Sequence, residues 1–174
     1  MGNKNRRVPK SPTVEVIPIP VNEIEQHPSM SFTGGILTVT IDYCAKKTQE
    51  EKDALMASLF NTLPSYAHWA KIIQIAIRPG VPHKDPAGVY LSHVKDMKFI
   101  IEQLNNFRMV DEVRMRIWIE YWNFPQLKLG AGLYGLKDKM STFGYVVEGN
   151  EPVRVSPRSH MMTRLEGVYR KEFR

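Results

Sequence analysis

Two arginines and a tryptophan, at alternate positions of one short segment, have the residue types and spacing best suited to binding chemistry. Arg114, Arg116 and Trp118 alternate with apolar residues across 113–121. That period-2 pattern predicts a strand with one buried and one open face, on which such residues stand about 6.6–6.8 Å apart. Arginine forms paired hydrogen bonds with phosphate, tryptophan stacks on bases, and both types are enriched at binding hot spots. The segment therefore predicts a binding surface.

Two further strands are expected to widen this surface. Residues 36–43 alternate apolar side chains with polar ones that include Thr40. Residues 72–78 place Gln74 and Ala76 on the side opposite to a row of isoleucines. We expect Thr40 and Gln74 to lie beside the arginines on the same open face.

The open face has an alternative interpretation, in which the chain itself covers it. Apolar residues recur at roughly helical spacing in 159–171, so a C-terminal helix would be able to lie over Trp118. Arg114 would then pair with Glu112 or Glu120. The sequence leaves both interpretations open.

Basic residues also cluster toward both ends of the chain. The formal net charge is +6 and the pI about 9.4, which favours acidic partners without specifying one. We expect these tails either to be solvated or to hold phosphates or an acidic surface. The tail residues are Lys4, Arg6, Arg7, Arg170 and Lys171.

A glycine cluster matches the spacing G-x-G-x-x-G at Gly130, Gly132 and Gly135. In a dinucleotide-binding fold such glycines directly follow a strand and bring a helix N-terminus onto a pyrophosphate. Here residues 123–129 intervene after the strand, and strand-like residues follow in place of a long helix. We interpret the glycines as a bend packed under Tyr134, and we expect no bound dinucleotide.

Cys44 is the one cysteine of the chain, and it is the candidate nucleophile in the alternative in which the protein is an enzyme. It would need one of the five histidines as a partner in space. A cysteine just past a strand end is more often structural, and no His or Cys pair has metal-site spacing. We expect no catalytic residue, no metal and no cofactor. A lone cysteine and the lack of an apolar membrane-spanning run predict an intracellular protein, cytoplasmic or nuclear.

The order of elements predicts an α/β domain whose helices lie on one face of an open mixed sheet. Strand–helix–strand units of this length form parallel crossovers, which are nearly always right-handed. A capping box at Thr48 and Glu51 predicts the first helix, and Ser92 is expected to cap the second. The expected strands are 36–43, 72–78, 113–121 and 143–148, and the expected helices are 49–62, 93–106 and 159–171.

The remaining segments are expected to be irregular or peripheral. The proline-containing stretch 14–21 predicts an edge strand or an extended strap. Residues 22–31 and 79–91 are expected to be loops. The resulting organisation is a flexible basic arm (1–12), an α/β core (13–150) and a basic C-terminal segment, expected to be helical (151–174).

One resemblance adds to this interpretation. A helix, Asn-Phe, the strand Val-Arg-Met-Arg-Ile-Trp-Ile, Pro-Gln-Leu and then Leu-Tyr-Gly-Leu-Lys follow one another within residues 55–148. This order resembles lineage-specific fungal α/β proteins with a degenerate repeat and no assigned activity. The resemblance implies an interaction module and carries over no catalytic residue.

These patterns favour a non-enzymatic module that binds a protein partner through its open sheet face and basic tails. The alternative is a nucleic-acid-binding module that uses the same face, for RNA more than for DNA. RNA-binding sheets present several stacking aromatics on their central strands. Here Trp118 has threonine and glutamine neighbours instead, which favours the protein partner. No membrane contact is expected.

Overall fold

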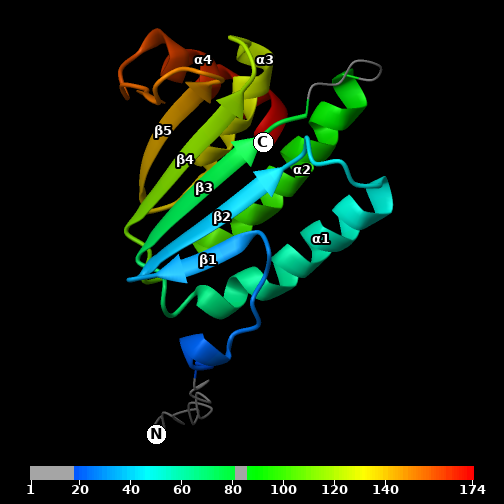
Figure 1. Ribbon diagram of the computed structural model, residues 1–174. Coiled ribbons are helices and arrows are strands. Elements are labelled where there is room, and N and C mark those ends of the chain that lie inside the picture. Colours follow the sequence, from blue (N-terminus) through cyan, green and yellow to red (C-terminus); the bar gives the residue numbers. More distant parts are fainter. Residues whose placement is uncertain (1–17, 81–85) are drawn as a thin grey trace, which may run out of the picture.

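A six-stranded mixed sheet carries the helices of this protein on one of its two faces (Figure 1). The computed structural model describes residues 18–80 and 86–174, and residues 86–89 through their backbone alone. The four central strands are parallel, and an antiparallel strand flanks them at each edge. In spatial order the strands are β1 Met30–Thr33, β2 Ile36–Asp42, β3 Ile72–Arg78, β4 Glu112–Ile119, β5 Met140–Val147 and β6 Val153–Arg154.

The helices connect the parallel strands and follow the last one. Three crossovers join β2 to β3, β3 to β4 and β4 to β5, and the C-terminal helix comes after β6. The α-helices are α1 Gln49–Thr62, α2 Pro86–Asn105, α3 Phe124–Leu127 and α4 His160–Val168. The described residues also form three 3-10 helices, η1 Val21–Glu23, η2 Leu63–Tyr66 and η3 Lys128–Gly135, and a π-helical turn, η4 Tyr169–Phe173.

Because the spatial order of the strands equals their sequence order, right-handed crossovers put every connecting helix on the same side. The alternate side chains of β2, β3 and β4 that face this side are buried, among them Val39, Ile75 and Met115. They form one core with α2 residues such as Met97. In Figure 1 the strands pass in front of α2, and no helix of residues 18–80 and 86–174 lies on their other face. The predicted open α/β sheet is confirmed.

Helix α1 begins and ends where the sequence predicts. The Glu51 N–H donates to Thr48 Oγ1 at 3.2 Å, and the Thr48 N–H donates to Glu51 Oε2 at 2.7 Å. This reciprocal capping box satisfies two amides that the first helical turn leaves free. Leu59 on the inner side of the helix is fully buried against the core.

Helix α2 is longer than predicted. It begins at Pro86, so the expected loop 79–91 is wrong for residues 86–91, and Ser92 lies inside the helix rather than at its cap. Proline suits the first turn of a helix, where its missing N–H would have no intrahelical partner. Residues 81–85 lie outside the described part of the chain.

The N-terminal edge of the sheet is also different from the prediction. The expected loop 22–31 is wrong at its end, because β1 begins at Met30 and pairs with β2. Gly34 and Gly35, with φ of 58° and 80°, form the two-residue turn between these strands. The sequence predicts an edge strand or an extended strap over residues 14–21. Residues 18–20 have no regular structure and Val21 begins η1, so the described part of this stretch forms no strand, and residues 14–17 lie outside the described part.

The C-terminal segment packs on the helix side of the molecule. The Tyr134 hydroxyl of η3 donates to the Met162 carbonyl of α4 at 2.8 Å. Leu165 and Phe173 are buried in the main core, and η4 contacts both η3 and α2. The alternative in which this helix covers the open face is therefore wrong. Residues 1–12, the expected flexible arm, lie outside the described part of the chain.

Within residues 18–80 and 86–174, no helix combines the length and apolar character needed to cross a bilayer.

Candidate functional site

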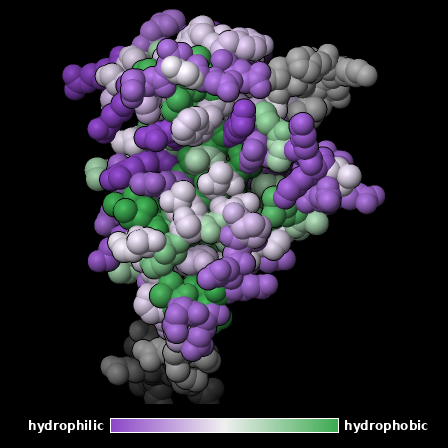
Figure 2. All heavy atoms as spheres, in the orientation of Figure 1, coloured by the Kyte–Doolittle hydropathy of each residue, from purple (hydrophilic) through white to green (hydrophobic). Residues whose placement is uncertain are grey.

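The five predicted binding residues lie on one surface, the uncovered face of the sheet. Strand register places Gln74 of β3 beside Arg114 of β4. Thr40 of β2 and Arg116 of β4 lie on either side of Ala76 of β3. Thr40 and Arg116 are exposed, and Gln74 is half-buried. In Figure 2 this side of the molecule is a mosaic, with purple hydrophilic side chains separated by pale and green ones.

The amino-terminal half of this face holds a basic hollow of about 760 Å³, lined by Arg114, Arg116, Arg154 and Glu112 among others. The Arg114 Nη2 atom lies 2.7 Å from Glu112 Oε2, and its hydrogen bond lowers the pKa of the Glu112 carboxyl. Within the described residues, neither Arg116 nor Arg154 forms an ion pair. Two guanidinium groups of the basic hollow are therefore open to a partner.

The carboxyl-terminal end of the same face holds an acidic hollow of about 450 Å³. Three carboxylates, those of Asp42, Glu120 and Glu148, line it together with Arg78. Arg78 is the strand neighbour of Asp42, so the acidic hollow holds one arginine against three carboxylates. The face thus changes from basic to acidic along the strand direction.

Trp118 separates the two hollows and lines both of them. Its side chain is 45% exposed, whereas its strand neighbour Val146 is 4% exposed. Val146 lies on the uncovered face and is not part of the main core. The indole therefore shields a small apolar spot and presents its remaining surface to solvent, which is the arrangement expected of a binding hot spot.

The structure does not bring the tail residues onto this face. Arg170 and Lys171 belong to η4, which packs against the helix layer. Arg170 also pairs with Glu166 one helical turn earlier. Lys4, Arg6 and Arg7 lie outside the described part of the chain.

The glycine cluster is a packing device of η3. A Cβ atom at Gly130 would stand 2.5 Å from Phe143 Cε2, and one at Gly132 would stand 2.7 Å from Met97 Cγ. The glycines let η3 lie close against the core and do not form the strand-to-helix turn of a phosphate-binding loop.

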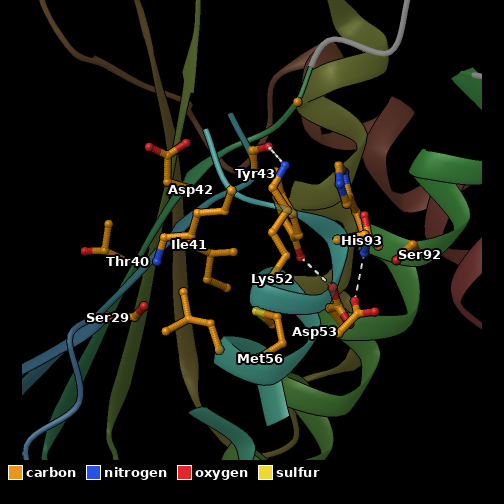
Figure 3. A pocket seen from close by; sticks show the side chains of 15 residues that line it. Ser29, Thr40, Ile41, Asp42, Tyr43, Lys52, Asp53, Met56, Ser92 and His93 are labelled. Atoms are coloured by element: carbon orange, nitrogen blue, oxygen red, sulfur yellow. Dashed lines mark hydrogen bonds between the residues drawn. The ribbon is translucent and has the colours of Figure 1, made fainter. Parts of the chain in front are cut away.

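Sequence reasoning missed a further concave site of about 360 Å³, where β2 and β3 end beside α1 and α2 (Figure 3). The Tyr43 ring stacks on the His93 ring with centroids 3.6 Å apart, and its hydroxyl donates to Asp96 Oδ2 at 3.0 Å. The Lys52 Nζ donates to the Tyr43 carbonyl at 3.1 Å. Tyr43 and Asp96 are 53 positions apart in the sequence. The signal available in the sequence was that the ends of parallel strands meet the helices that follow them.

Burial shifts the titration of this cluster. It raises the pKa of Tyr43 and of Asp96, and it lowers the pKa of His93 to about 4, helped by the nearby charge of Lys52. His93 is therefore neutral at pH 7. The network ties the β2–α1 loop to α2.

Cys44 does not have the surroundings of an activated nucleophile. Its thiol donates to the Pro79 carbonyl at 3.3 Å, and burial, followed by the charge of Asp42, raises its pKa. A raised pKa disfavours the reactive thiolate. Within the described residues, no cluster of three or more His, Cys, Asp and Glu side chains is suited to a metal ion.

Comparisons of this chain with protein-family models, with curated proteins and with solved structures find no significant match.

Proposed function

We propose that this chain is a non-enzymatic interaction module that binds a protein partner through the uncovered face of its sheet. The observation that supports the proposal most is the half-exposed indole of Trp118 between two hollows of opposite charge. Tryptophan and arginine dominate the binding energy of protein interfaces when a partner desolvates them. The proposal places the module inside the cell, where a lone cysteine such as Cys44 stays reduced.

A capture experiment with matched variants tests this proposal. Wild-type protein, the double variant Arg116→Ala/Trp118→Ala and the control Lys95→Ala/Phe99→Ala are immobilised and exposed to native lysate treated with nuclease. The control removes one cation and one exposed aromatic from α2, on the other side of the sheet. The proposal predicts a protein that wild type and control retain and that Arg116→Ala/Trp118→Ala loses. Equal capture by all three would contradict it.

A second candidate function is nucleic-acid binding on the same face, with RNA preferred. One observation favours it: Arg114, Arg116 and Arg154 surround the basic hollow next to an aromatic ring that can stack on a base. Phosphate-driven binding weakens steeply as salt rises, whereas an apolar protein contact changes little. Capture that nuclease abolishes, with a steep salt dependence, would select this candidate over the protein partner.

A further inference from the structure

The charges along β4 form a gradient. Arg116 stands in the basic hollow, Trp118 follows it on the same side of the strand, and Glu120 follows Trp118 into the acidic hollow. Arg154 reinforces the basic end and Glu148 the acidic end. A partner that covers Trp118 from both hollows therefore meets cations on one side and carboxylates on the other.

The spacing of this gradient matches an extended chain. Alternate residues of a strand lie about 6.6–6.8 Å apart, and the same distance separates alternate residues of an extended peptide. A segment lying along β4 can thus place residues i, i+2 and i+4 over Arg116, Trp118 and Glu120. A polymer of uniform negative charge fits less well, because its backbone would cross Asp42, Glu120 and Glu148.

We propose that the partner presents an extended segment of mixed charge to this face, and the inference rests on the proposed function above. An acidic residue contacts Arg116 and Arg154, an apolar residue two positions away packs on Trp118, and a basic residue two positions further contacts Glu120. Opposite charges at the two ends fix the direction of the segment along the strand.

Synthetic peptides provide the test. The mixed probe is acetyl-Thr-Glu-Thr-Ile-Thr-Lys-Thr-amide, used with its reversed sequence so that both directions along β4 are sampled. Two control peptides carry charges of a single sign: one has glutamate at both charged positions, and the other has lysine at both. Binding to ¹⁵N-labelled protein is followed through the indole N–H of Trp118. Trp122 is the internal control, because it is also exposed but pairs with Tyr145, whose side chain packs against the core.

Of the mixed peptide and its reversed sequence, the one that binds more tightly should shift the indole signal of Trp118 and leave that of Trp122 unchanged. The all-glutamate peptide should bind about fivefold more weakly, since one exposed attraction becomes a repulsion. The variant Glu120→Lys should reverse this order and prefer the all-glutamate peptide.

Three results would overturn the inference: equal binding of mixed and single-sign peptides, no saturable binding of any, or tighter binding of a single-stranded uridylate nonamer at physiological salt. The peptide titration can give one of these results while the capture experiment still shows a protein that wild type retains and Arg116→Ala/Trp118→Ala does not. In that case the extended mixed-charge segment is wrong and the protein-binding role stands. If both experiments fail, both are wrong.

Discussion

Replacing Gly130 with alanine should destabilise the protein through a clash in the core. The added Cβ would lie 2.5 Å from Phe143 Cε2 and 2.9 Å from its Cζ, whereas carbon atoms in good contact lie about 3.5–4.0 Å apart. Phe143 is 2% exposed and rigid, so its ring has to move by about an ångström inside packed surroundings.

Overpacking of this kind costs typically 1–3 kcal/mol, and an aromatic neighbour places Gly130→Ala near the upper end, at about 2–3 kcal/mol. For a chain of this size that corresponds to a fall in Tm of roughly 5–10 °C. Gly132→Ala should cost less, about 1–2 kcal/mol of unfolding free energy, because its neighbour is Met97, and an unbranched methionine side chain adapts its shape more readily than a phenylalanine ring.

Gly167→Ala is the matched control. Gly167 lies in α4, and a Cβ atom there would meet nothing within 4 Å. The helix propensity of alanine should then stabilise the protein by about 0.5–1 kcal/mol. Thermal and urea unfolding of the three variants measure the differences. A Gly130→Ala protein that melts within about 2 °C of wild type, or saturable NAD or ATP binding lost in Gly132→Ala, would refute the packing account.

Further predictions concern stability. Trp118→Ala should cost about 1–2 kcal/mol, since half of the side chain is exposed, whereas Met115→Ala on the buried side of the same strand should cost about 2–5 kcal/mol; equal losses in urea unfolding would contradict an open face. Because the folded-state pKa of His93 is about 4, below its ordinary 6.5, its contribution is complete above pH 6.5. This stability is lost as the pH falls toward 4, by up to roughly 3 kcal/mol, because the unfolded chain takes up the His93 proton first. Asp96 partly offsets the loss, since its raised pKa lets the folded state take up the Asp96 proton first. Thermal melts of His93→Phe should therefore show a flatter dependence of Tm on pH. Thr48→Ala should cost about 1 kcal/mol while Thr48→Ser costs little, and equal melting of the two would argue against the cap.

Patterns within a short stretch of sequence were sufficient for much of the fold. The alternation in β2, β3 and β4 and the capping box of α1 are local signals, and each produced the observed element. The Gly34-Gly35 pair was a hairpin signal as well, yet β1 was missed because only four residues precede the turn. The start of helix α2 was predicted too late because the three prolines and two glycines of residues 79–91 favour a loop, although the first turn of a helix accepts proline.

The site depends on contacts that no local pattern specifies. Strand alternation placed Arg116 and Trp118 on one face, but whether α4 covers that face is decided by the packing of Leu165 and Phe173 on the helix side. The network of Tyr43 and His93 joins residues 50 positions apart and was not predictable from spacing.

Site-specific photocrosslinking tests the proposal that the uncovered sheet face binds a protein partner. The variant Thr40→p-benzoylphenylalanine, at an exposed position of the same face that keeps Trp118, is irradiated in nuclease-treated lysate, with Phe99→p-benzoylphenylalanine on the helix side as control. We expect a discrete protein adduct at position 40 that excess wild-type protein suppresses and that excess Arg116→Ala/Trp118→Ala does not. An adduct at position 99 alone, or suppression by both competitors alike, would contradict the proposal.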